Sequence, residues 1–188
     1  MPAGTLFGDS PASGVDVDLE FVKSQKQKAT YRKHAMSVEA RLKELGITLP
    51  PAPPAGGIYS PVVVVDRMAY VSGQVPFGPD GKFLTGRVGA DLTQEQGAAA
   101  ARSTGLTMLA TLKASLGSLD RIKRAVKVLG MVNSTPDFPN HPEVMNGFSG
   151  LMVEIFGEAG KAARSAVGMG TLPRNVPVEV EAIFELHS

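Results

Sequence analysis

Cysteine is absent from this chain of 188 residues. Its absence excludes disulfides, thiolate nucleophiles and cysteine-ligated zinc, and it agrees with a reducing compartment. No apolar run approaches the roughly 20 residues that a membrane-spanning helix needs. The N-terminus has no apolar signal core, and its four acidic residues, Asp9, Asp16, Asp18 and Glu20, argue against a transit peptide. We therefore expect a cytoplasmic protein without membrane contacts, and we leave an organellar location open.

The chain also has no large excess of either positive or negative charge. The formal net charge is +1, with 20% charged and 43% hydrophobic residues, which is the composition of an ordinary globular protein. Such a balance argues against nucleic acid as the main partner, although a local basic patch stays possible. The length fits one domain with a proper core.

Groups for common catalytic chemistry are few. The three histidines are His34, His141 and His187, and no pair has metal-ligand spacing. His141 is expected in a turn. The sequence contains neither a G-x-S-x-G elbow nor a G-x-x-x-x-G-K-[ST] phosphate loop. We expect no metal and no cofactor.

The first part of the chain is expected to be an appendage. Residues 1–35 predict a flexible or loosely structured extension, in which the basic stretch from Lys23 to His34 is either a surface for an anionic partner or, as we favour, a solvated tail. Residues 36–57 predict a short helix capped by Ser37, followed by a proline-rich linker. The compact domain is expected over residues 58–188.

Within that domain the pattern begins with a hairpin and a long helix. Two β-rich runs, Val62–Val65 and Met68–Ser72, flank Asp66-Arg67, a pair that lacks the glycine preferred in two-residue turns. Phe77–Phe83 predicts a turn. A helix is expected from about Thr93 to Leu116, with a capping box between Thr93 and Gln96. Gly97 and Gly105 would allow this helix to pack closely on a sheet.

The second half predicts strands around another helix. Arg121–Asn133 alternates as a strand with Val126, Val128 and Val132 on one face. A helix is expected from about Glu143 to Phe156, and a strand over Arg164–Met169. The order ββ-α-β-α-ββ favours an α+β fold in which two helices pack on one face of a mixed sheet.

The last strand, Val176–Leu186, has the clearest two-residue period in the chain. Val178, Val180, Ala182, Phe184 and Leu186 share one face, and Glu179, Glu181, Ile183 and Glu185 share the other. This carboxylate row is either a wet strand face or a site in which proximity raises one pKa.

Arg164 poses a similar choice at the start of the preceding strand. Its guanidinium is either exposed to solvent or available to bind a carboxylate, because burying a charge without a partner is costly. If the two strands paired antiparallel, Arg164 and Glu179 would need a long offset to face each other. They would instead be able to meet across a subunit boundary.

Four stretches together carry a family resemblance: YVSGQVPFGPDGKF, the DFP and MNGF elements, ARSAVGMGTLP, and VPVEVEAIFEL. In this order they resemble the Rid (reactive intermediate deaminase) superfamily, also called YjgF-like or endoribonuclease L-PSP-like, which has the chorismate-mutase-like fold. The likeness covers about residues 58–186, and the N-terminal helix resembles a longer subgroup. The resemblance implies a homotrimer with ligand clefts between neighbouring subunits.

The resemblance also implies a site. Arg164 would grip a substrate carboxylate and the Ala166 backbone would bind the ligand, while Glu179 would position or activate a water. The substrate-binding residues implied by the motifs are Arg164, Ala166, Tyr59, Gly73 and Asn146. In deaminating members the substrate is a 2-imino or 2-enamino acid, hydrolysed to a 2-keto acid and ammonia without a cofactor.

This chain departs from the deaminase pattern in its R-S-x-V stretch. Ala166 replaces a common cysteine, and Gly168-Met169-Gly170 stand where a glutamate, an apolar and a small residue are typical. The alternatives are therefore a non-catalytic protein that binds a small carboxylate on the same trimer and, ranked last, an endoribonuclease.

Overall fold

Five strands form one mixed sheet in the computed structural model of the protein, which describes residues 37–188. The strands are β1 (Val62–Val65), β2 (Met68–Gln74), β3 (Ile122–Asn133), β4 (Ala163–Met169) and β5 (Val178–Leu186). Their order is β1-β2-β5-β3-β4, in which only the β3–β4 pair is parallel. The prediction for residues 1–35 lies outside the described residues and stays a prediction.

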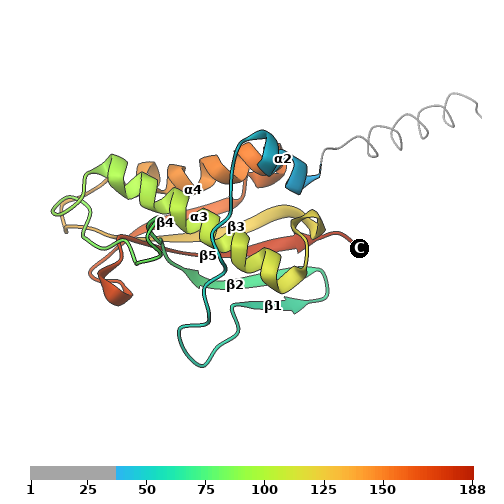
Figure 1. The fold of residues 1–188 in the computed structure, drawn as a ribbon. Helices are drawn as coiled ribbons and strands as arrows, with labels where there is room; N and C mark the ends of the chain where they lie inside the picture. The colour runs from blue at the N-terminus through green and yellow to red at the C-terminus, as the bar shows by residue number, and fades with distance from the viewer. Residues whose placement is uncertain (1–36) are drawn as a thin grey trace, which may run out of the picture. The chain divides into compact units, whose positions relative to one another are not determined.

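Two long helices cover one face of this sheet, as expected (Figure 1). They are α3 (Gln94–Leu116) and α4 (His141–Phe156). Residues on the helix side of β5, such as Phe184, are fully buried against α3 residues such as Met108 and Leu112. No helix of residues 37–188 lies over the opposite face of the sheet, which carries the carboxylate row of β5 (Figure 1). The α+β fold of the chorismate-mutase-like type is confirmed.

Helix α3 begins and ends at the predicted signals. Thr93 and Gln96 form the capping box, and Gly117, with a φ of 83°, ends the helix. The expected reason for its glycines was wrong, however. A Cβ at Gly105 would collide with Leu151 and crowd Phe148, and one at Gly97 would crowd Val144. These glycines therefore allow α3 to approach α4 rather than the sheet.

The hairpin of β1 and β2 forms without glycine because Asp66 itself adopts the left-handed conformation, with a φ of 52°. A short polar side chain tolerates this region better than most residues do.

Two predicted details of the second half need correction. The register of β3 against β5 shifts between Ala125 and Lys127, so Ala125 and Val128 are buried while Val126 is half exposed. A β-bulge of this kind breaks the two-residue period on which the prediction relied. Helix α4 begins at His141 rather than near Glu143, with Pro142 in its first turn, where the missing N–H costs nothing.

The N-terminal helix α2 (Val38–Glu44) is fastened to the rest of the unit Ser37–Ser188. Leu42 is buried in the core, Arg41 Nε donates to the carbonyl of Glu154 at 2.9 Å, and Lys113 pairs with Glu39 at 2.9 Å. The predicted short helix is therefore present and packs against the core, while the predicted domain boundaries stay a prediction. No helix within residues 37–188 has both the length and the apolar character needed to cross a bilayer.

Candidate functional site

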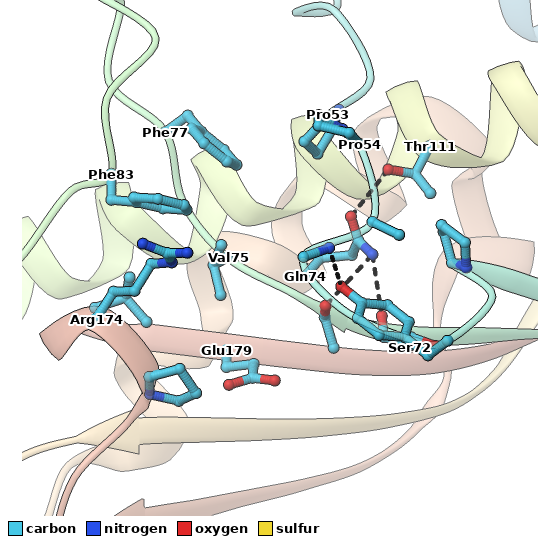
Figure 2. A pocket seen from close by; sticks show the side chains of 17 residues that line it. Pro53, Pro54, Ser72, Gln74, Val75, Phe77, Phe83, Thr111, Arg174 and Glu179 are labelled. Carbon is cyan, nitrogen blue, oxygen red and sulfur yellow. Dashed lines mark hydrogen bonds between the residues drawn. The ribbon is translucent and has the colours of Figure 1, made fainter.

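The six residues implied by the motifs fall into two groups. Tyr59, Gly73 and Glu179 line a cavity of about 460 Å³ near the end of β2 (Figure 2). Arg164, Ala166 and Asn146 lie instead where α4 meets β4, the edge strand of the sheet. The protomer therefore presents two separate half-sites.

A β-bulge shapes the first half-site. The register of β2 against β5 shifts between Val71 and Gln74, which leaves Ser72 and Gly73 unpaired. The buried side chain of Gln74 fixes this irregularity, since it donates to the carbonyl of Ser72 at 3.1 Å and accepts from Thr111 Oγ1 at 2.9 Å. A Cβ at Gly73 would overlap the carboxylate of Glu179, so only glycine leaves room for that group.

Glu179 is the carboxylate of this half-site. It lies between the buried Val178 and Val180 and points away from the helices, half-buried, into the cavity. Within residues 37–188 no hydrogen bond or ion pair reaches it. Burial, and secondarily the negative charge of Glu181, raises the pKa of Glu179. The group is thus a stronger base than an ordinary glutamate.

Tyr59, in the turn before β1, and Ser72, in β2, supply hydroxyl groups to the cavity. The hydroxyl of Tyr59 accepts from the backbone N–H of Gly56 at 3.1 Å, and Ser72 Oγ donates to the carbonyl of Ser60 at 2.8 Å. Tyr59 is nevertheless 49% exposed. These bonds hold the turn against β2 and leave the phenol facing solvent and cavity.

The far side of the cavity carries residues that sequence reasoning missed. Phe77 and Phe83 contact each other with ring centroids 4.7 Å apart, and the guanidinium of Arg174 lies 4.9 Å from the Phe83 centroid (Figure 2). The sequence signal was present as two phenylalanines flanking the G-P-D-G-K turn, but only the fold brings Arg174 to them.

Arg164 anchors the second half-site. Its Nη1 donates to Asn146 Oδ1 and to Ser149 Oγ, both at 3.0 Å, and its Nη2 donates to the carbonyl of Pro142 at 3.2 Å. All three acceptors are neutral, and no carboxylate in residues 37–188 forms an ion pair with Arg164. The guanidinium is held in place while its charge, its Nε–H and one Nη2–H remain for a further partner.

Ala166 lies two residues further along β4 on the same face. It is in register with Gly130, which is in register with the buried Val180, so Ala166 faces the helix side. Because β4 pairs only with β3, part of its backbone polar groups points away from the sheet. The implied backbone contact of Ala166 thus falls on an open edge.

His141 lies closer to this half-site than the sequence indicated. Its Nε2 is 3.0 Å from the Oγ of the buried Ser134, and its ring meets the edge of Phe138. A side chain at Gly168 would collide with this ring. The departure from the family pattern at Gly168 therefore makes room for a histidine.

Metal ligands are not gathered here. Within residues 37–188, no three histidine or carboxylate side chains lie close enough together to hold a metal ion.

The mixed sheet has this strand order and carries two helices on one face. With an arginine on the edge strand and a glutamate on β5, this arrangement is that of an α+β protein of the chorismate-mutase-like class. Residues 39–186 match the family described as "YjgF/chorismate_mutase-like, putative endoribonuclease". The chain belongs to this family.

Known relatives cover most of the described residues. The chain is 43% identical over 152 residues to Protein TCP17 of Trypanosoma cruzi, covering 80% of this chain and 95% of that one. It is 32% identical over 132 residues to the mitochondrial Protein MMF1 of Saccharomyces cerevisiae, covering 70% and 77%.

Solved structures agree. A protein of unknown function, Atu1372 of Agrobacterium tumefaciens, matches with a TM-score of 0.72 at 42% identity, covering 80% of this chain and 94% of that one. A "putative endoribonuclease" of Shewanella oneidensis matches with a TM-score of 0.76 at 36% identity, covering 80% and 99%. RidA of a Psychrobacter species matches with a TM-score of 0.50 at 27% identity, covering 72% and 94%.

Proposed function

We propose that the protein is a hydrolytic deaminase of 2-imino and 2-enamino acids, acting in a cleft where two copies of the chain bring their half-sites together. The observation that carries the proposal is the state of Arg164. Its guanidinium is immobilised by neutral acceptors, has no carboxylate partner within residues 37–188 and keeps two N–H groups available. Such a group is prepared to bind a small carboxylate through charge-assisted hydrogen bonds.

The placement of the two groups of residues in one protomer supports an intersubunit cleft. In one protomer Arg164 faces the helix side of the sheet, while Glu179 faces the open side. A substrate held by Arg164 of one copy would therefore need Glu179 of a neighbouring copy. The homotrimer that the family resemblance implies would provide this arrangement.

The chemistry balances without an added reagent. Water adds to the carbon of the protonated imine, so that a C–O bond forms and the C=N π pair goes to nitrogen. Glu179 takes the proton released by the water and returns it to the nitrogen of the resulting carbinolamine. The C–N bond then breaks, ammonia leaves, the oxygen pair forms the ketone, and the hydroxyl proton passes to solvent.

The groups of the cavity suit these steps. The raised pKa of Glu179 makes its carboxylate a stronger base, which favours proton transfer near neutral pH. Arg164 would orient the substrate, and orientation is a large part of what such an electrophilic carbon requires. Tyr59 would supply a hydroxyl at the rim, and Asn146 would keep the guanidinium aimed.

The test is the hydrolysis of imines made in place by an amino-acid oxidase. The proposal expects 2-keto acid and ammonia to form faster than the spontaneous rate, and this acceleration to disappear in Arg164→Ala. An unaccelerated reaction with every imine tried would overturn it. Tight keto-acid binding without turnover would then assign the non-catalytic alternative, and RNA cleavage would assign the activity that the family's description carries.

The compartment also stays a proposal. We propose a cytoplasmic or organellar location, and the yeast relative MMF1 is a mitochondrial protein.

A further inference from the structure

One side of the cavity beside Glu179 is lined by aromatic residues. A cavity of about 460 Å³ falls in the range of pockets that enclose drug-sized ligands, and a three-carbon acid would leave most of it empty. The space beyond Glu179 therefore has room for a large substrate side chain.

The walls of this space are flat and apolar. Phe77, Phe83, Pro53 and Pro54 line it, with Val75 and Val176 between them. Figure 2 shows Phe77, Phe83 and Arg174 on one side of the cavity and the two prolines across from them. Flat rings pack well against other flat rings, and such pairs stabilise a complex beyond the area they bury.

The aromatic wall is built to stay in place. The backbone N–H of Gly78 donates to the carbonyl of Lys82 at 2.8 Å, which closes the turn between the two phenylalanines. Ser103 Oγ, from α3, donates to the carbonyl of Phe77 at 2.7 Å. The two rings are thus tied both to each other and to the helix layer.

The side chain of Arg174 completes this wall. Its backbone lies in the left-handed region. Arg174 and Asn175 have φ values of 56° and 55°, a conformation that residues other than glycine seldom adopt. Asn133 and Gly86 hold the turn, because Asn133 Nδ2 donates to Asn175 Oδ1 at 3.0 Å and the Gly86 N–H donates to the carbonyl of Asn175 at 2.8 Å. This turn places the guanidinium of Arg174 over the Phe83 ring, and a guanidinium is an attractive neighbour for a further planar π system.

We propose that this space is a side-chain subsite for aromatic substrates, so that the enzyme acts on 2-imino acids with an aryl side chain in preference to two- to four-carbon imino acids. The inference rests on the proposed function for the reacting group and on the Phe77, Phe83 and Arg174 wall for the side chain. Arg174 is placed here as a selecting residue, since it contacts the side chain rather than the reacting carbon.

Two measurements with the full-length protein separate this inference from the proposed function. The first measurement compares the dissociation constants of phenylpyruvate and pyruvate, determined by calorimetry. The second is kcat/KM for imines generated from phenylalanine and from alanine. We expect phenylpyruvate to bind on the order of ten- to hundred-fold more tightly, with a similar preference in kcat/KM.

A matched pair of variants localises the effect. Phe83→Leu removes the ring but keeps apolar bulk, and we expect it to erase most of the preference for phenylpyruvate over pyruvate. Phe156→Leu makes the same change at the end of α4, outside the cavity, and should leave the preference intact.

The outcomes are distinct. Turnover of imines with no aryl preference would overturn this inference and leave the proposed function standing. Aryl preference in binding without turnover of any imine would overturn the proposed function and support the subsite. Tighter binding of 2-oxoglutarate than of phenylpyruvate, lost in Arg174→Ala, would overturn the inference in favour of dicarboxylic substrates.

Discussion

Arg164 and Glu179 project from opposite faces of one sheet. Arg164 is in register with Val128, whose side chain is buried under the helices, whereas Glu179 is in register with Met131 and alternates with the buried Val178 and Val180. Strand β3 lies between the two strands that carry them. A single protomer therefore keeps its cationic and its basic group apart, and the proposed chemistry requires a second copy.

Replacing Arg164 with lysine tests whether ligand binding needs the planar guanidinium group or only its positive charge. Lysine keeps the positive charge but loses the planar donors that reach Asn146, Ser149 and the Pro142 carbonyl. We expect Arg164→Lys to weaken binding of a 2-keto acid roughly ten- to hundred-fold, in line with the loss of charge-assisted hydrogen bonds. Calorimetry gives the measurement. Arg67→Ala, in the exposed β1–β2 turn, is the control, and a loss of binding there as large as in Arg164→Lys would contradict the assignment.

Replacing Glu179 with glutamine should lower the rate and change the pH profile. Loss of a general base costs about 10²- to 10⁴-fold in kcat. In the wild type, kcat/KM should rise with pH through the pKa of Glu179, which lies above that of an ordinary glutamate because burial disfavours its charge. This rise should be missing from the residual activity of Glu179→Gln, and an unchanged profile would remove Glu179 from the mechanism.

The same substitution has a stability effect of known sign. A carboxyl group whose pKa is raised in the folded state stabilises the fold at low pH, and this contribution is lost as pH rises through the folded pKa. Glu179→Gln should therefore have a higher melting temperature than the wild type at neutral pH, with the difference shrinking below the ordinary pKa of glutamate. Thermal melts from pH 4 to pH 8 test this, and a variant less stable than the wild type at neutral pH would contradict the raised pKa of Glu179.

Gly73→Ala tests the close approach of β2 to Glu179. The new methyl group would occupy the position of the Glu179 carboxylate, so we expect a cost of about 1–3 kcal/mol and a displaced Glu179 side chain. Gly150→Ala, on the exposed side of α4 with no atom near the added carbon, should be neutral or stabilising. Denaturant unfolding and steady-state kinetics of both variants decide the matter. Full activity in Gly73→Ala would mean that Gly73 is needed only for the backbone conformation of β2 and not to leave room for the Glu179 carboxylate.

Thr111→Val tests the bond that fixes the β2 bulge. The valine would leave buried Gln74 Oε1 without its donor, at a cost of about 1–3 kcal/mol. Thr107→Val is the matched control on the same helix, because its hydroxyl bonds only to the Ser103 carbonyl of α3 itself. Thr111→Val should lower the free energy of unfolding by more than Thr107→Val does, beyond the experimental error. Equal losses in the two variants would show that the bulge does not need the bond between Thr111 and Gln74.

The fold could be predicted because its signals are local. The alternation in β5, the capping box at Thr93 and the two apolar runs of the hairpin depend only on neighbours in the sequence. The errors arose where tertiary contacts decide. Bulges in β3 shifted the buried face away from Val126, and the glycines of α3 serve α4 rather than the sheet.

The sequence could supply only some of the residues of the candidate site, for the same reason. Motif resemblance supplied the candidates Arg164, Glu179 and Tyr59, but it was silent on Arg174, whose position beside Phe83 depends on a left-handed turn, and on His141, whose ring needs the space at Gly168. Contacts of this kind join segments far apart in the chain and have no local pattern.

The most direct test of the central claim is complementation between two inactive variants. Arg164→Ala and Glu179→Gln chains, coexpressed in equal amounts, should form about one wild-type cleft in four if each cleft takes its arginine from one copy and its glutamate from another. The account predicts that the mixed assembly recovers roughly a quarter of the wild-type imine hydrolysis. A mixture verified by native mass spectrometry to contain both chains in one assembly, yet as inactive as either variant alone, would contradict it.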